Sequence, residues 1–367
     1  MLRAGIIGLP NVGKSTLFNA LIRSRKAPAE NYPFCTIDPN IGIVQIPDDR
    51  LKQISAVAKV NTLIPTAIEF VDIAGLVKGA SKGEGLGNKF LSHIREVDAI
   101  VHVVRCFEDP DIAHVTGNID PIRDIEIVNY ELIIADIELL HKRKEKIYKE
   151  VKHGEKHAIA EDQILNKIEA HLNSGKPVLT LNLSKEEREL IKNCPFLTDK
   201  PSIYVANLKE STIGMGFNDP YAAKVREYVQ THIGCDTIAV CAQLESDLID
   251  LAPEEAAEYM KELGITESSL DALIRTTYKL LGLRTFFTFN EKEVRAWTVR
   301  SDTPAVKAAG LIHSDFERGF VRAEVIHWDK LVSAGSVAHA REKGYYRIEG
   351  KDYIVNDGDV ILFKVNV

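Results

Sequence analysis

Long apolar segments and paired cysteines are both missing from this sequence. No stretch is apolar for long enough to span a bilayer, and residues 1–15 hold only a short apolar run before the first glycines. The five cysteines are Cys35, Cys106, Cys194, Cys235 and Cys241. Their number is odd and none has the close Cys or His spacing of a zinc site, which is typical of reduced thiols. We therefore expect a soluble cytoplasmic protein with no disulfide, no zinc site and no membrane association.

An excess of basic residues is also absent, as are internal repeats and low-complexity tracts. The net charge is −7, with 46 lysines and arginines against 53 acidic residues. This balance argues against indiscriminate nucleic-acid binding over the whole surface, although it allows a local basic patch. The chain has 367 residues, of which 45% are hydrophobic. That length favours two or three domains, each with a core of its own.

Strand-like and helical segments alternate in two parts of the chain. The predicted strands cover residues 3–8, 41–46, 67–75, 98–107, 201–209 and 236–243, and the predicted helices between them cover residues 14–23, 48–60 and 220–234. This alternation is typical of an α/β sheet covered by helices. Further helices are predicted within residues 245–281.

The segment from residue 125 to residue 198 has a different pattern. Its apolar residues recur at helical spacing, at Ile133, Ile137, Leu140, Ile147 and Val151 and again at Ile164, Ile168 and Leu172. The pattern predicts an antiparallel helical coiled-coil insertion. Residues 141–157 are rich in lysine, arginine and histidine, which indicates either a solvated outer face, the interpretation we favour, or a nucleic-acid-facing arm.

Aromatic, alternating strands replace the α/β pattern after Gly282. Residues 284–290, 294–299 and 353–365 are predicted strands around a central short helix, and residues 356–359 carry a strong turn signal. We assign three domains: a nucleotide-binding domain of residues 1–124 plus 199–281, the helical insertion of residues 125–198, and a small α+β domain of residues 282–367.

The strongest motif is the phosphate-binding loop Gly8-Leu-Pro-Asn-Val-Gly13-Lys14-Ser15, between a predicted strand and a predicted helix. Its backbone N–H groups face phosphates, Lys14 reaches the β- and γ-phosphate oxygens, and the Ser15 hydroxyl ligates Mg²⁺. The predicted nucleotide contacts here are Asn11, Val12, Gly13, Lys14, Ser15 and Thr16.

Three residues complete the predicted phosphate and metal site. Asp72 ends a strand at the place where such a fold has its second metal ligand, a carboxylate. Gly75 can offer its N–H to a γ-phosphate. Thr36 lies in a loop that can close over Mg²⁺ and the γ-phosphate. We expect Ser15, Thr36 and Asp72 to hold the metal, and Lys14, Thr36 and Gly75 to act on the phosphates.

These motifs together resemble the Obg-related P-loop proteins, and specifically the YchF or Obg-like ATPase family. The resemblance is carried by "GLPNVGKST", "NYPFCTIDPN", "DIAGLVKGASKGEGLGNKF", "IYVAN" with Glu210 three places after the asparagine, and "NDGDVILFKV". It covers essentially the whole chain. It implies a Ras-like P-loop NTPase sheet, the helical insertion, and a C-terminal TGS domain, which is a ubiquitin-like β-grasp fold. It also implies a nucleotide-dependent factor of the translation class that prefers ATP and acts at the ribosome.

The residues after the predicted strand at 201–209 indicate which base is bound. Guanine is read by an aspartate that accepts from N1–H and the 2-amino group, whereas adenine offers neither donor. This chain has Asn207, Leu208 and Glu210 at that place, and Cys241-Ala242-Gln243 in the second recognition segment. We expect Asn207 to hold the loop and the backbone around Leu208 to serve adenine. A relaxed site that also takes GTP stays open as the alternative.

The residue that orients the attacking water is not evident, because Leu76 stands where many GTPases have glutamine. Among His93, His102 and His114 we favour His114, in a loop, and expect His102 to be structural. Asn11 resembles the asparagine with which some relatives hold K⁺, which makes K⁺ a second candidate cofactor. Slow hydrolysis leaves two classes open, an ATPase and a nucleotide-switched RNA-binding module with negligible turnover.

The expected partners are ATP and the ribosome or ribosomal RNA, and nothing in the sequence implies an oligomer rather than a monomer. The basic residues that suggest an RNA groove are Lys142, Arg143, Lys144 and Lys146 in the insertion, and Arg284, Arg295, Arg318, Arg322 and Lys364 in the C-terminal domain. The glycines between Gly79 and Gly87 predict a flexible switch segment.

Overall fold

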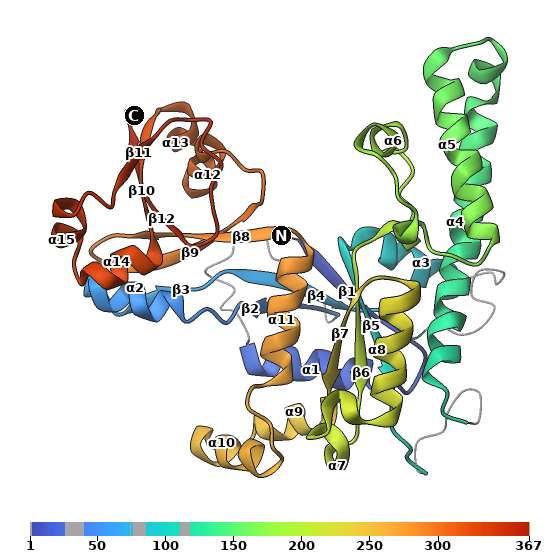
Figure 1. The fold of residues 1–367 in the computed structure, drawn as a ribbon, viewed down its shortest axis with the longest axis horizontal. Helices are drawn as coiled ribbons and strands as arrows, with labels where there is room; N and C mark the ends of the chain where they lie inside the picture. Colours follow the sequence, from blue (N-terminus) through green and yellow to red (C-terminus); the bar gives the residue numbers. More distant parts are fainter. Residues whose placement is uncertain (1, 26–39, 74, 76–85, 111–117, 367) are drawn as a thin grey trace. The chain divides into compact units, whose positions relative to one another are not determined.

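The computed structural model describes residues 2–25, 40–73, 75, 86–110 and 118–366, and its elements are drawn in Figure 1. Its contacts divide the chain into two compact units. The first contains the described residues of 1–24, 36–42 and 69–273, and the second contains those of 25–35, 43–68 and 274–367. Within the described residues, no helix has both the length and the apolar character that a membrane crossing requires.

A six-stranded sheet organises the first unit. Its strands, in spatial order, are β2 (Ile41–Gln45), β4 (Ala67–Asp72), β1 (Arg3–Ile7), β5 (Ala99–Arg105), β6 (Ser202–Asn207) and β7 (Asp236–Val240). The pairs from β4 to β7 are parallel. β5 and β6 are buried along their whole length, as expected for central parallel strands covered on both faces. The carboxyl ends of these strands therefore share one edge of the sheet, where a P-loop fold binds its nucleotide.

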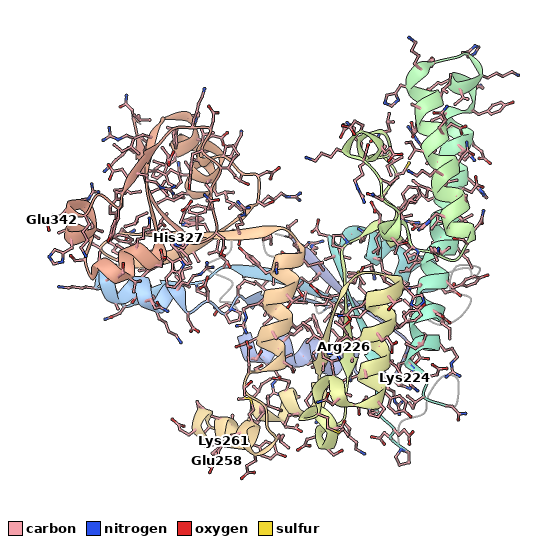
Figure 2. The ribbon with its side chains drawn as sticks, in the orientation of Figure 1. Lys224, Arg226, Glu258, Lys261, His327 and Glu342 are labelled. Atoms are coloured by element: carbon pink, nitrogen blue, oxygen red, sulfur yellow. The ribbon has the colours of Figure 1, made fainter. Side chains whose placement is uncertain are left out.

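Several helices of the first unit lie where the sequence predicts helices. The main ones are α1 (Lys14–Arg25), α3 (Leu86–Glu96), α7 (Glu210–Ile213), α8 (Pro220–His232), α9 (Ala242–Leu248), α10 (Pro253–Glu262) and α11 (Ser269–Leu280), which continues into the second unit. On α8, Val225 and Val229 are buried while Lys224 and Arg226 are exposed (Figure 2). Asp219 caps this helix by accepting from the N–H groups of Tyr221 and Ala222.

The predicted switch segment lies largely outside the described residues. Residues 76–85 are among those that the structure does not describe, but Gly87 falls within helix α3. The sequence analysis did not predict α3, because a run of glycines at its start disfavours a helix.

The helical insertion forms the antiparallel hairpin that the sequence predicts. It consists of α4 (Pro121–Lys152) and α5 (Lys156–Asn173), with Gly154 between them in the left-handed region at φ 81°. α4 begins four residues before the predicted start, where Asp120 caps it and Pro121 takes the first helical position. The seam buries the predicted apolar residues, including Ile133, Leu140, Ile147, Ile164 and Ile168.

The chain returns from the hairpin through short helical segments. These are η2 (Val178–Thr180), α6 (Lys185–Leu190) and η3 (Leu197–Asp199). Asp136, on α4, is fully buried and accepts hydrogen bonds from the N–H groups of Leu197 and Thr198 and from the Thr198 hydroxyl, at 2.7–2.8 Å. Burial raises the pKa of Asp136 to about 6. This carboxyl group fixes the base of the hairpin to the segment that leads into β6.

The second unit is built on another six-stranded sheet. Its spatial order is β11 (Arg347–Glu349), β10 (Phe320–His327), β12 (Asp359–Val365), β8 (Leu283–Phe289), β9 (Glu293–Arg300) and β3 (Thr62–Ile64). β12 and β8 are parallel, whereas β10 is antiparallel to both β11 and β12. Four short helices accompany the sheet, α12 (Ala305–Ile312), α13 (Ser314–Arg318), α14 (Trp328–Ala334) and α15 (Val337–Glu342).

Parts of this unit differ from the sequence prediction. The single central helix is replaced by four, and β10 was not predicted. The predicted strand before the turn at residues 356–359 is reduced to one bridge between Ile354 and Pro304. Because Asp357 Oδ1 accepts from the Thr285 N–H at 2.8 Å and Gly358 N–H donates to the Thr285 carbonyl, the turn binds β8 instead of closing a hairpin.

Residues 43–68 lie in the second unit, although we assigned them to the nucleotide-binding domain. Strand β3 pairs in parallel with β9, with Leu63 opposite Val294. Helix α2 (Arg50–Ala58) buries Leu51 and Ile54 in the same apolar cluster as Phe287. Burial of this apolar face places the segment here, which strand and helix patterns along the chain do not reveal. The three-domain division itself stays a prediction.

Shortening Ile54 tests this placement. Ile54→Ala should destabilise the second unit by about 2–4 kcal/mol, because the side chain is fully buried in the cluster with Phe287. Both tryptophans of the chain, Trp297 and Trp328, lie in this unit, so urea unfolding followed by tryptophan fluorescence measures its stability directly. Lys52→Ala, at an exposed site on the same helix, is the control. Equal unfolding midpoints for the two variants would contradict the assignment.

Candidate functional site

The phosphate-binding loop joins β1 to α1 and depends on two glycines. Gly8 has φ 149°, and a Cβ there would lie 2.4 Å from the carbonyl oxygen of Val103. Gly13 has φ 95°, and a Cβ there would lie 2.3 Å from Nδ2 of Asn207. Any side chain at either position would therefore displace the loop from β5 or β6.

Lys14 lies inside this loop, with only 7% of its surface exposed. Its ammonium group donates to the Leu9 carbonyl at 2.7 Å, and a Cβ on Gly75 would lie 3.0 Å from it. Burial lowers the pKa of Lys14 to about 8, opposed by the attraction of Asp72. The loop thus holds a cation that a phosphate can stabilise far better than one neutral carbonyl.

Ser15 and Asp72 meet at the expected metal position. The Ser15 hydroxyl donates to Asp72 Oδ2 at 2.8 Å. Among the described residues, the other carboxylate oxygen, Oδ1, is buried without a hydrogen-bond partner. A hydroxyl and an unsatisfied carboxylate oxygen are hard oxygen donors of the kind that Mg²⁺ takes alongside phosphate oxygens and water. The residues present therefore fit Mg²⁺, while Thr36, the third predicted ligand, lies outside the described residues.

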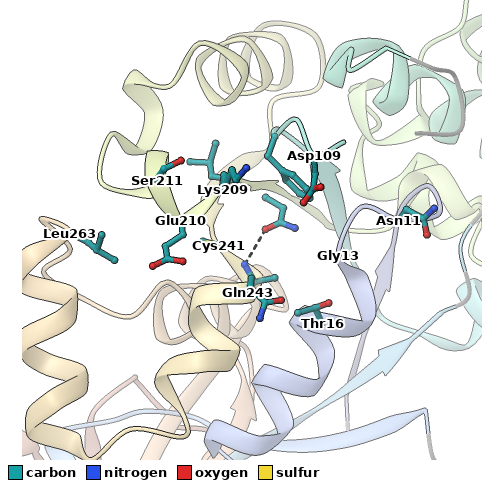
Figure 3. Close-up of a pocket in the computed structure, with 14 residues that line it drawn as sticks. Asn11, Gly13, Thr16, Asp109, Lys209, Glu210, Ser211, Cys241, Gln243 and Leu263 are labelled. Atoms are coloured by element: carbon teal, nitrogen blue, oxygen red, sulfur yellow. Dashed lines mark hydrogen bonds between the residues drawn. The ribbon is translucent and has the colours of Figure 1, made fainter. Parts of the chain in front are cut away.

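Asn207 connects the two halves of the candidate site. Its Nδ2 donates to the Val12 carbonyl at 2.8 Å, and its Oδ1 accepts from the Ala242 N–H at 3.0 Å, the dashed line in Figure 3. The side chain is buried. One amide group therefore joins the phosphate-binding loop to the start of α9, as expected for a loop-holding asparagine.

A cavity of about 660 Å³ lies beside Asn207 (Figure 3). Predicted residues that line it are Asn11, Gly13, Thr16, Asn207, Leu208, Glu210, Cys241, Ala242 and Gln243. Val12, Lys14 and Ser15 are not among the lining residues: the Val12 carbonyl accepts from Asn207, and Lys14 and Ser15 make the contacts with Leu9 and Asp72 described above. Phe107, Asp109 and Leu263 also line it, but no local motif singles them out, because they reach it from distant parts of the chain. The cavity therefore brings both predicted base-recognition segments together.

Leu208 lies between the cavity and the apolar core. Its side chain is buried in the core with Val104 and Tyr204, and its N–H donates to the Val240 carbonyl at 2.7 Å. The Leu208 N–H is therefore used within the structure and does not serve the base. That other backbone groups around Leu208 serve adenine stays a prediction.

Glu210 begins helix α7 and lines the same cavity. The hydroxyl of Tyr259, on α10, donates a hydrogen bond to its Oε1. The pKa of Tyr259 is raised by this hydrogen bond, so the hydroxyl stays a donor at neutral pH. The sequence carries no signal for this pair, because the two residues are far apart along the chain.

The three candidate histidines have different surroundings. His102 is buried in β5, and burial together with Lys14 lowers its pKa to about 3, so it stays neutral and structural as expected. His93 lines a second cavity, of about 390 Å³, together with Ser15 and Asp72. His114, the favoured candidate, lies outside the described residues.

These features define a P-loop nucleotide-binding protein of the GTPase type. Residues 3–146 match a family model described as a 50S ribosome-binding GTPase. Residues 283–366 match the model of the C-terminal region of YchF GTPases, described as a protein of unknown function.

Full-length relatives identify the family. The chain is 52% identical over 366 residues to the ribosome-binding ATPase YchF of Bacillus subtilis, with 100% of both chains covered. It is 50% identical to the Haemophilus influenzae protein of the same name, covering 100% of this chain and 99% of the relative. The solved Schizosaccharomyces pombe YchF GTPase has a TM-score of 0.88 and 39% identity, covering 99% of this chain and 97% of that one. The chain belongs to the YchF family.

A more distant structure shows the fold alone. The GTP binding protein from Pyrococcus horikoshii OT3 matches with a TM-score of 0.59 and 20% identity over 100% of both chains.

The pKa of Lys14 predicts a pH dependence of nucleotide affinity. A bound phosphate favours the ammonium form and raises this pKa above its value of about 8 in the free protein. Binding therefore takes up a proton above pH about 8, and affinity falls as pH rises, by at most about tenfold per unit.

Calorimetry with ATP in two buffers of different ionisation enthalpy counts that proton. Lys14→Arg is the control, because its guanidinium does not titrate in this range. Affinity and proton uptake of the unaltered protein that stay flat from pH about 7.5 to about 9.5 would contradict the assignment.

Proposed function

We propose that this protein is an Mg²⁺-dependent ATPase that binds the ribosome, acting in the cytoplasm as a monomer. Relatives that share about half of its residues over their full length are named ribosome-binding ATPases. The observation that carries the proposal is the joining of the phosphate-binding loop to the base cavity through Asn207.

The names of relatives do not decide the base, since other relatives are described as GTPases. The proposed preference for ATP therefore rests on the geometry of the cavity. Guanine needs an acid with both oxygens turned to N1–H and the 2-amino group, and adenine does not. Glu210 already accepts from Tyr259, and we assign the contact with adenine N6 to the backbone around Leu208, which borders the cavity. The site therefore favours ATP, and a relaxed GTPase is the alternative.

The phosphate side supplies the remaining roles. Lys14 and the backbone N–H groups from Asn11 to Thr16 bind the phosphates. Ser15, Thr36 and Asp72 hold Mg²⁺, which supplies positive charge beside the phosphate oxygens when bound. Gly75 lies next to the Lys14 ammonium group, which supports the assignment of its N–H to the γ-phosphate.

Two further roles follow from the absence of a glutamine after Gly75. We assign the water-positioning role to His114, and the turnover of His114→Ala at saturating ATP tests it. We assign K⁺ binding to Asn11, which lines the base cavity with φ 61°. Equal rates of hydrolysis in potassium and in sodium would exclude that ion.

Calorimetry with ATP and GTP, followed by steady-state turnover with and without ribosomes, tests the function. We expect ATP to bind at least about tenfold more tightly than GTP, since the two-oxygen contact with guanine is not available. Tighter binding of GTP would establish the GTPase alternative. Tight ATP binding with no turnover in either condition would establish a nucleotide-switched RNA-binding module.

The helical hairpin is the proposed ribosomal RNA surface, but two of its basic residues have another role. Arg143 binds Glu161 of α5 through two hydrogen bonds of 2.6 and 2.9 Å. Lys144 binds Glu169 at 2.6 Å and Asn166 at 2.7 Å. Both hold the two helices together. The basic residues that remain exposed towards the tip are Lys142, Lys146, Lys149, Lys152 and Lys156.

Three of these exposed lysines make one face of α4. Lys142, Lys146 and Lys149 are spaced by four and three residues, which places them on one side of the helix. Tyr148 is 62% exposed on an adjoining face. Lysines beside an exposed aromatic ring suit RNA phosphates and an unstacked base.

Charge reversal of this face tests the surface without breaking the hairpin. Lys142→Glu, Lys146→Glu and Lys149→Glu together should weaken co-sedimentation with ribosomes and lower its salt dependence by about one unit per lysine. The control is the triple reversal of Lys185, Lys224 and Lys279, which are exposed and change the net charge equally. Unchanged binding of the first variant would favour a protein contact or the C-terminal domain instead.

A further inference from the structure

The hydrogen bond between Tyr259 and Glu210 joins α10 to the base cavity. Glu210 is the first residue of α7, and Figure 3 shows it on the same side of the cavity as Leu263, opposite Asn11. Tyr259 donates to Oε1, one of the two carboxylate oxygens. The contact therefore acts on the side chain that stands three residues after Asn207, where a guanine-binding protein has its base-reading acid.

Packing fixes the position of Tyr259. Tyr259 and Leu263 pack against the apolar cluster that contains Leu208 and Ile213. A Cβ on Gly214 would lie 2.2 Å from the Leu263 carbonyl, so the end of α10 approaches the α7 segment very closely. The ring of Tyr259 is partly buried against this cluster, which limits the positions that its hydroxyl can take beside Glu210.

The side chains around Tyr259 on α10 point elsewhere. Glu258 and Lys261 are exposed on the outer side of this helix (Figure 2). All residues of the element other than Ala256, Tyr259 and Met260 are exposed. From α10, the Tyr259 hydroxyl is the group that hydrogen-bonds to Glu210, while Glu262 adds a negative charge close enough to act on Tyr259.

Reading guanine needs both oxygens of the acid, because N1–H and the 2-amino group are parallel donors. Each carboxylate oxygen can accept two hydrogen bonds, but a tyrosine hydroxyl on one oxygen restrains the direction in which the carboxylate faces, and so opposes the alignment of both oxygens with two parallel donors. Adenine has no donor at N1 or C2, so it loses nothing from this restraint.

We propose that Tyr259 is a positioning residue that sets nucleotide preference by holding Glu210 away from the guanine edge. The inference rests on the proposed function, in which ATP is the preferred nucleotide, and it names the restraint that produces the preference. Removing the hydroxyl frees both oxygens of Glu210.

Tyr259→Phe tests the restraint, with ATP and GTP dissociation constants measured by calorimetry. GTP affinity should rise about tenfold relative to ATP, the value of one hydrogen bond to a charged group. The ATP affinity should change little. Tyr228→Phe is the matched control, because it removes a tyrosine hydroxyl that donates to Glu126 at 3.3 Å on the outside of the same unit.

A double-mutant cycle separates this role from a structural one. In a Glu210→Gln background, Tyr259→Phe should leave the ATP to GTP ratio unchanged, because Tyr259 acts only through the carboxylate. Glu258→Gln, on the outer side of α10, controls for the loss of one negative charge. A purely structural tyrosine would lower both affinities equally in either background.

The outcomes distinguish this inference from the proposed function. If the unaltered protein prefers ATP but Tyr259→Phe keeps the same ratio, the inference is wrong and the ATPase assignment stands. If the unaltered protein prefers GTP, the assignment of ATP fails first. If Tyr259→Phe lowers the melting temperature, Glu210→Asp is the second test of the restraint. Its shorter side chain cannot reach the Tyr259 hydroxyl, so this variant should also shift the preference towards GTP.

Discussion

The candidate site depends on a single buried amide. Asn207 donates to the phosphate-binding loop at Val12 and accepts from the backbone at Ala242. These two segments are otherwise separate loops at the ends of different strands, and nothing in either sequence makes them rigid relative to each other. An unsatisfied amide buried here would cost about 1–3 kcal/mol per lost partner, so Asn207 holds the phosphate-binding loop and the start of α9 in a fixed relation.

That coupling explains why a phosphate-binding motif alone says little about the base. The loop from Gly8 to Ser15 binds any nucleoside triphosphate, since its contacts are to phosphates. The preference for one base over another depends on the groups on the other side of Asn207. There the Leu208 N–H is bonded to the Val240 carbonyl. Glu210 accepts a hydrogen bond from Tyr259.

Sequence patterns predicted the features that depend on residues close together in the chain. The loop between β1 and α1, Asp72 at a strand end and the helical hairpin all follow from spacing within one or two elements, and the structure has them at these places. Contacts between distant segments could not be predicted. Two hydrogen bonds depend on how separate helices pack, the one between Tyr259 and Glu210 and the one between Arg143 and Glu161. The role of Leu208 depends on which carbonyl accepts from its N–H.

The pairing of β3 with β9 has a consequence for how the chain is made. Thr62 pairs with Glu293, and Leu51 and Ile54 share a core with Phe287. A ribosome synthesises the whole of β5, the helical hairpin, β6 and β7 between these partners. While these segments are being synthesised, the apolar face of α2 has no native core to pack against. Pairing of strands that are this far apart in the sequence, such as β3 and β9, is slow. The first sheet, with β2 and β4, can be completed while α2 and β3 still lack their partners. Synthesis of the C-terminal strands, and not of the nucleotide-binding loop, therefore sets the moment at which α2 and β3 become native.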